Sequence, residues 1–196
     1  MDVRIVLTGK SPLVMHSARL ADPLYEITRA IKQITDKRTK TEADYESIAR
    51  MEWIGGLYTG ESEHKDKIVV PTWNVVRSLE EAAKVTRMGK TVIRSLSPYE
   101  SEVPLDFPDS ERHPHELWEL DEQYRFSTLV GIQRNKTTRM RPQFPIWSLT
   151  MTALLQEELL DFDELGRIAT QAGKIEGLGD ARKLGKGRFD AKVEKL

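Results

Sequence analysis

Glycine and positive charge alternate in one short stretch, EGLGDARKLGKGRF, which spans residues 176–189. Glycine lets a backbone approach a ligand closely, and its exposed N–H groups can then bind phosphate oxygens, while interleaved Lys and Arg supply charge. The pattern predicts a cradle for a nucleic-acid backbone. Its members would be Lys174, Gly177, Gly179, Arg182, Lys183, Gly185, Lys186, Gly187 and Arg188.

Other glycine-rich phosphate sites are excluded by the order of the elements. A dinucleotide-binding fingerprint and a P-loop both need a glycine turn that leads from a strand into a helix, whereas these glycines follow a predicted helix and precede a strand. A structural alternative stays open, in which Gly173 or Gly177 caps the helix and the rest is a flexible loop.

A second basic stretch, GIQRNKTTRMRPQF at 131–144, joins two predicted strands and contains no acid. We expect a loop whose Arg134, Lys136, Arg139 and Arg141 hold phosphates, with Phe144 available to stack on a base. A hairpin loop with solvated charges is the alternative. Lys37, Arg38 and Lys40 are weaker candidates for the same role.

His16 follows the apolar residues SPLVM and is a weak catalytic candidate. A histidine can act as a general acid or base, and such a role would need a second His or a Tyr and a cation as partners. A structural histidine is the alternative. His113, His115 and Glu116 resemble a metal cluster, but Pro114 favours a loop, so we expect no metal and no cofactor.

The net charge of −1 conceals an uneven distribution. Residues 100–122 hold nine acids and one base, whereas 131–150 hold four bases and no acid. Such asymmetry is typical of a polyanion-binding face. The chain has no cysteine, no signal-peptide pattern and no apolar run of about 18 residues, so we expect a cytoplasmic protein outside the membrane.

Alternation of apolar and polar residues predicts strands, and apolar residues three or four apart predict helices. We expect one α+β domain over 1–196, a modified ferredoxin-like (RRM-like) fold with an antiparallel sheet and two helices on one face. A largely helical insertion would occupy 10–67, an acidic connection 97–122 and the glycine-rich loop 173–188. The expected strands are 2–8, 67–70, 124–132, 145–155 and 188–196, with strand-like pieces at 91–96 and 103–107, and the expected helices are 24–34, 41–53, 72–89 and 161–172.

The tryptophans give further expectations. Trp73 and Trp147 fall on inward positions of the predicted elements, whereas Trp118, in the acidic stretch, is available for a partner. That stretch is expected to be solvated, or to dock on the basic face of a second copy.

Residues 177–189, GLGDARKLGKGRF, resemble the glycine-rich loop of the RAMP superfamily, the repeat-associated proteins of CRISPR effector complexes. A weaker similarity lies in a short strand, a proline and a helix, carried by Val70, Pro71, Val76, Arg77, Leu79, Ala82 and Ala83. Segments 15–23 and 55–58 are similar to parts of short phage proteins, so the chain also resembles a free-standing phage-encoded relative, which would lie in the host cytoplasm.

The resemblance implies a ferredoxin-like backbone subunit that binds single-stranded RNA or DNA and assembles along the strand into an oligomer or filament. It also implies an insertion after the first strand that reaches along the nucleic acid. Two alternatives stay open: a metal-independent endoribonuclease that uses His16, and a structural or protein-interaction module.

Overall fold

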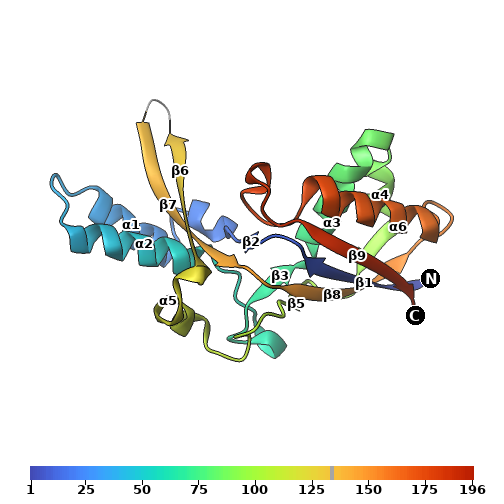
Figure 1. Ribbon diagram of the computed structural model, residues 1–196, viewed down its shortest axis with the longest axis horizontal. Helices are drawn as coiled ribbons and strands as arrows, with labels where there is room; N and C mark the ends of the chain where they lie inside the picture. The colour runs from blue at the N-terminus through green and yellow to red at the C-terminus, as the bar shows by residue number, and fades with distance from the viewer. Residues whose placement is uncertain (133–134) are drawn as a thin grey trace.

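The computed structural model describes residues 1–132 and 135–196, and it is a mixed α+β structure with antiparallel sheets. Figure 1 shows an elongated molecule with a sheet and its helices at one end and a helical pair beside a β-hairpin at the other. Both ends of the chain lie together at the outer ends of the neighbouring strands β1 and β9 (Figure 1). His16 and the loop cation Lys186 lie between the two groups of elements.

The largest sheet has the strand order β4-β8-β1-β9, and each neighbouring pair is antiparallel. Alternation sets its two faces, because Val3, Ile5 and Leu7 are buried and pair with the buried Ala153, Met151 and Leu149. The strands confirm the predicted first, fourth and last strands. Their bounds are β1 Asp2–Gly9, β4 Leu96–Pro98, β8 Ser148–Leu155 and β9 Phe189–Lys195.

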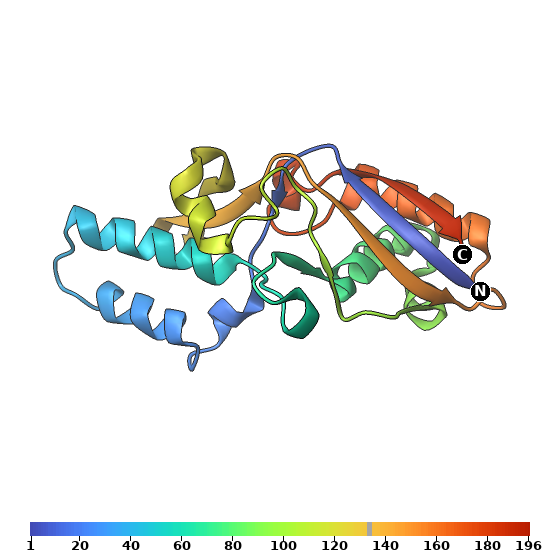
Figure 2. The ribbon, with the colours of Figure 1, turned by 90° about the horizontal axis from the view of Figure 1, so that it is seen from below.

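One face of this sheet is covered by helices, as Figures 1 and 2 both show. They are α3 (Thr72–Ala83), α4 (Gly89–Ser95) and α6 (Phe162–Gln171). The strand predicted over 91–96 is wrong, because residues 91–95 are helical and Val92 is buried. Gly89 begins α4 instead of ending α3, and Trp73 is 51 % exposed on α3, not inward.

A second sheet, β2-β7-β6, corrects two expectations. The strand expected over 124–132 is β6 (Arg125–Ile132), but it pairs with β7 (Asn135–Phe144) outside the main sheet. The basic stretch expected to be a loop is mostly β7 itself. Consecutive residues pair from Arg125 with Pro142 to Ile132 with Asn135, so residues 135–142 belong to the hairpin. β2 is Leu13–Val14, and β3 (Val69–Pro71) pairs with β5 (Glu102–Pro104).

The helices predicted within 10–67 are present, as α1 (Glu26–Thr35) and α2 (Glu42–Gly56). Thr41 caps α2, and Asp44 accepts a hydrogen bond from the Thr41 N–H in return. α2 ends at Gly56. A Cβ on Gly56 would lie 2.9 Å from Cδ of Pro142, so the glycine lets α2 approach β7 closely.

The acidic connection 97–122 is folded and not a solvated loop. It contributes Leu105, Phe107, Leu117 and Trp118 to the core, with α5 at Leu117–Leu120. Trp118 meets Trp53 edge to face and lies against Arg125, so it is not free for a partner. Most of the acids are exposed positions between these buried anchors, whereas Glu102 and Asp109 are half-buried. None of the helices in the described ranges has the length and apolarity needed to cross a membrane.

Candidate nucleic-acid interface

The glycines of the loop 177–188 allow the chain to pack against itself. Gly177, Gly179, Gly185 and Gly187 all have positive φ. A Cβ on Gly187 would collide with the Leu178 carbonyl oxygen, and one on Gly179 with the Val14 carbonyl oxygen, whereas Gly185 faces open space. Gly177 also follows the π-helical turn Ala172–Glu176 as its cap, so the structural role considered for it is present.

The expectation of bare amides in this loop is largely wrong. The N–H groups of Leu178, Asp180 and Gly187 donate to the carbonyls of Gly187, Val14 and Pro12, at 2.7–2.8 Å. Those of Gly177 and Gly185 donate to Ala172 and Arg182. These bonds fix the loop beside β2, so the loop can offer a ligand its side chains more than its backbone.

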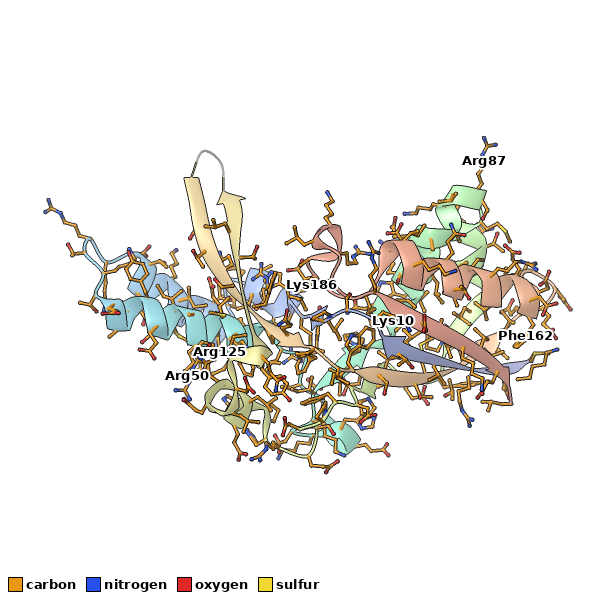
Figure 3. The ribbon with its side chains drawn as sticks, viewed as in Figure 1. Lys10, Arg50, Arg87, Arg125, Phe162 and Lys186 are labelled. Carbon is orange, nitrogen blue, oxygen red and sulfur yellow. The ribbon has the colours of Figure 1, made fainter. Side chains whose placement is uncertain are left out.

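The cationic side chains of the loop are not paired with acids, but Arg188 is half-buried and its Nη1 atom is fully buried. Among the ion pairs of the described residues, no carboxylate neutralises Arg182, Lys183, Lys186 or Arg188. Arg182 and Lys183 are exposed. Lys186 donates to Oε1 of Gln143 at 2.9 Å and lies over the Phe126 ring, which places it between the loop and the hairpin (Figure 3).

The hairpin arginines differ, because acids from other elements pair with them. Arg139 binds Glu52 of α2, and Arg141 donates through Nε to Asp180 of the glycine loop at 2.9 Å. The inference that no acid neutralises this stretch is therefore wrong for both. Arg134 lies outside the described residues. Lys136 pairs with Gly131 through its backbone, and its side chain is not described.

His16 lies between two pockets and lines both. One pocket, of about 350 Å³, also has Arg139, Arg141 and Glu52 in its wall. The other, of about 220 Å³, is lined by Tyr58, Asn74, Arg77, Ser78, Gly177, Leu178, Gly179, Asp180 and Arg182 as well. Burial holds the pKa of His16 below its usual value, and the positive charge of Arg141 acts in the same direction. The imidazole is therefore mainly neutral at pH 7.

The smaller pocket holds groups that sequence reasoning missed as site residues. The Tyr58 hydroxyl donates to the His16 carbonyl at 3.2 Å, and Arg77, which is paired with Glu80, also lines this pocket. In the sequence, Arg77 is notable only as part of the strand, proline and helix similarity at residues 70–83. Tyr58 and Asn74 carry no local signal, because only the tertiary fold brings α3 beside the segment after α2.

The remaining candidates lie elsewhere. Lys174 is exposed in a groove between α6 and β9, with Phe162 and Lys192, and lines neither His16 pocket. Lys37 is paired with Asp44 at 2.6 Å. His113 and His115 stack on each other, and no group of metal-binding side chains occurs among the residues that were described.

Comparison with known proteins adds no relative: no family model matches the chain, and no curated protein matches it.

Proposed function

We propose that this protein binds single-stranded nucleic acid through its phosphates, on a surface formed by the loop 177–188, the residues around His16 and strand β7. The observation that carries the proposal is the set of loop cations without a carboxylate partner in the described part of the chain, next to pockets that contain further arginines. Most contacts would be ionic and independent of base sequence.

The topology supports the same proposal. In the order β4-β8-β1-β9, α3 lies in the connection from β1 to β4, and α6 connects β8 to β9. This order supports a ferredoxin-like split βαβ fold as part of the proposal, with the glycine-rich loop before its last strand. We therefore retain kinship with the RAMP superfamily, and assembly of several copies along one strand, as parts of the proposal.

The test is the binding of fluorescent 30-mers of RNA and of DNA across a salt series. For single strands the slope of log K against log salt is about −0.7 per neutralised phosphate. Reversing Arg182, Lys183 and Lys186 to Glu should reduce the slope by about two and weaken binding at least tenfold. A matched control reverses Arg87, Lys90 and Arg94, which are exposed on the α3–α4 side and give the same net charge.

Equal losses in both triple variants, or an affinity that ignores salt, would overturn the proposal. Mass photometry of the complexes on strands of increasing length tests assembly, because a strand-lining protein should add copies as the strand lengthens.

A second candidate is RNA cleavage without metal, favoured by the pocket that His16, Tyr58, Arg77 and Arg182 share. His16 would move a proton, and the arginines would stabilise the charged pentacovalent phosphorus. Structured RNA incubated in EDTA tests it. Cleavage that disappears in His16→Ala, while the affinity for RNA persists, supports catalysis, and intact RNA with the parent protein contradicts it.

A further inference from the structure

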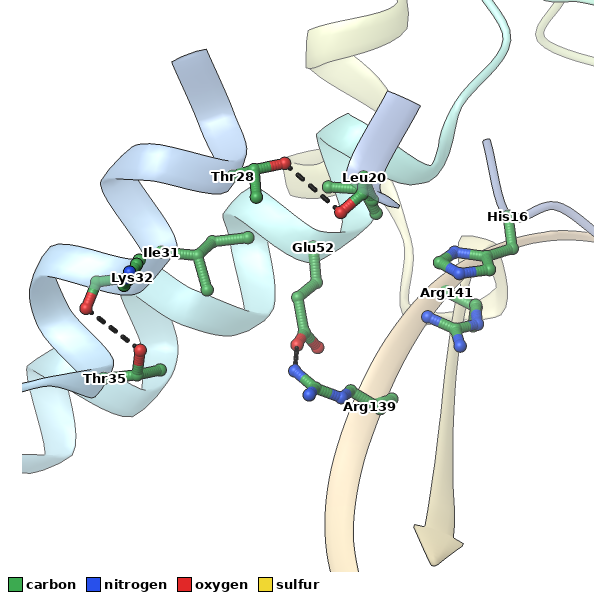
Figure 4. Close-up of a pocket in the computed structure, with 9 residues that line it drawn as sticks. All are labelled: His16, Leu20, Thr28, Ile31, Lys32, Thr35, Glu52, Arg139 and Arg141. Atoms are coloured by element: carbon green, nitrogen blue, oxygen red, sulfur yellow. Dashed lines mark hydrogen bonds and ion pairs between the residues drawn. The ribbon is translucent and has the colours of Figure 1, made fainter. Parts of the chain in front are cut away.

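The larger His16 pocket lies between α1, α2 and β7 and has two unlike walls. Figure 4 shows His16 and Arg141 next to each other on one side, with the α1 residues Thr28, Ile31, Lys32 and Thr35 facing them. Its volume of about 350 Å³ lies within the range of ligand pockets, which starts near 300 Å³. The pocket is thus large enough for a ligand of drug-like size.

The polar wall is suited to a phosphate. Arg141 is only 9 % exposed, and its Nε–H is committed to Asp180. Among the described residues, no hydrogen-bond acceptor is bound to the two terminal nitrogens of Arg141. Arg141 lines the pocket, so these nitrogens can bind a ligand. A guanidinium fixed at one edge offers the remaining pair of donors in a geometry that matches two phosphate oxygens. The His16 ring beside it can donate a further hydrogen bond.

The acid in the pocket does not oppose an anion. Glu52 is 4 % exposed, pairs with Arg139 and accepts a hydrogen bond from the Met140 N–H at 2.9 Å. Its charge is therefore already compensated. With Arg139, Arg141 and Lys32 against one carboxylate, the pocket lining stays positive.

The opposite wall is suited to a flat, partly apolar group. Leu20 and Ile31 offer aliphatic surface, and Thr28 and Thr35 lie on the same wall. The two threonine hydroxyls donate to the carbonyls of Leu20 and Lys32, at 3.3 and 3.0 Å, so each oxygen can still accept a hydrogen bond. A nucleobase has faces that pack on aliphatic groups and an edge that donates to such oxygens.

We propose that this pocket binds one nucleotide, with its phosphate on Arg141 and His16 and its base against Ile31 and Leu20. The inference rests on the proposed function in one respect: the nucleotide belongs to the bound strand. It assigns the helical segment between β1 and β3 a direct part in binding, since α1 supplies the base wall.

The experiment uses the full chain labelled with ¹⁵N and titrated separately with adenosine 5′-monophosphate, adenosine and inorganic phosphate. The nucleotide should shift the His16 ring signals and the amides of residues 28–35, and bind at least about tenfold more tightly than either part alone. The assignment would be overturned if inorganic phosphate bound as tightly as the nucleotide. It would also be overturned if the nucleotide shifted neither the His16 ring signals nor the amide signals of residues 28–35.

Three variants separate a role in the pocket from a general effect on stability. Ile31→Glu should weaken nucleotide binding at least tenfold, because it places a carboxylate in the base wall. Ile34→Glu is the matched control: it lies one turn further along α1, is also half-buried and does not line the pocket. Arg141→Lys should keep the charge and lose the paired donors. Equal affinity in all three variants would contradict the proposal.

The failures of the two proposals are distinguishable. If 30-mers bind with the expected salt slope but the nucleotide leaves the pocket signals unchanged, the pocket assignment alone is wrong. If no 30-mer binds and the nucleotide still shifts both walls, strand binding is wrong, and the pocket is a site for a free nucleotide.

Discussion

At Asp180, a contact that stabilises the fold weakens the proposed binding of phosphate. Its carboxylate accepts from Arg141 Nε at 2.9 Å and from the Ala181 N–H at 2.7 Å. The same contact that fixes the glycine loop against β7 also reduces the positive charge available to a phosphate. A ligand phosphate would have to share Arg141 with this acid.

Replacement Asp180→Asn should therefore tighten strand binding. The amide oxygen can still accept from Ala181, but the negative charge is lost, so we expect about fivefold higher affinity, as is usual for one nearby charge. Fluorescence anisotropy measures it. Asp190→Asn is the control, since that acid is exposed and pairs with Lys10. A weaker or unchanged affinity in Asp180→Asn alone would contradict the competition.

His16 predicts a pH dependence of binding. Its pKa lies below the usual value because of burial and Arg141, and a bound phosphate would raise it. Binding would then take up a proton, so affinity should rise as pH falls from 8 to 6, by up to about tenfold for each unit that the pKa rises. The charged groups that face His16 are Arg139, Arg141, Glu52, Asp180, Lys32, Arg77 and Arg182.

Anisotropy titrations at pH 6, 7 and 8 measure this effect, and His16→Ala should flatten the profile. A profile that is equally steep in His16→Ala would assign the proton to another group.

At the scale of the element, the glycines of the loop 177–188 have two different roles: some only adopt a positive φ, and others also allow close packing. Gly185 and Gly187 share a positive φ, but only Gly187 leaves no room for a side chain. Gly185→Ala should cost about 1 kcal/mol in backbone strain. Gly187→Ala adds a collision with the Leu178 carbonyl and should cost about 3 kcal/mol or more. Urea unfolding measures both, and equal costs would contradict the packing role.

Helix α2 offers a second test at this scale. Thr41→Ala removes the side chain that accepts from the Asp44 N–H and should lower stability by about 1 kcal/mol. Lys37 and the Thr41 N–H hold the pKa of Asp44 at about 2, below its usual value. The stabilisation by this carboxylate is therefore complete above its unfolded pKa and is lost as pH falls toward 2. The urea midpoint should fall more between pH 6 and pH 2.5 in the parent protein than in Asp44→Asn, which lacks the carboxylate.

Sequence patterns predicted the helices and strands better than they predicted the tertiary contacts between side chains. The alternation in β1, β8 and β9 and the caps Thr41 and Asp161 are local signals, and the structure contains all of them. The partners of Arg139 and Arg141 are distant in the chain, at Glu52 and Asp180, so no local pattern indicates them. β4 was missed because it has only three residues and follows directly on α4.

At the scale of the whole molecule, the candidate surface lies where the two groups of elements meet. β7 contacts α2 on one side, and its Arg141 reaches Asp180 of the loop on the other. β2, on the segment that leaves β1, pairs with β7 as well. Loss of the contacts between the groups would therefore separate the residues proposed to bind one strand.

The acidic connection should behave as part of the core when it is altered. Trp118→Ala removes a ring that is 6 % exposed and packs on Trp53 and Arg125, and should cost about 3 kcal/mol. Thermal unfolding measures it. Leu120→Ala, 41 % exposed on the same short helix, should change stability by less than about 1 kcal/mol. A similar effect of both substitutions would contradict the core assignment.

The neighbouring ends of the chain have a practical consequence. The Met1 amino group donates to the Leu155 carbonyl at 3.0 Å, and the Leu196 N–H donates to Asp2 at 3.0 Å, at the edge of the molecule remote from the glycine loop. A dye or a tether on either terminus would thus be attached at the end of the molecule remote from the proposed interface. Single copies could be immobilised on glass with the proposed interface facing the solution.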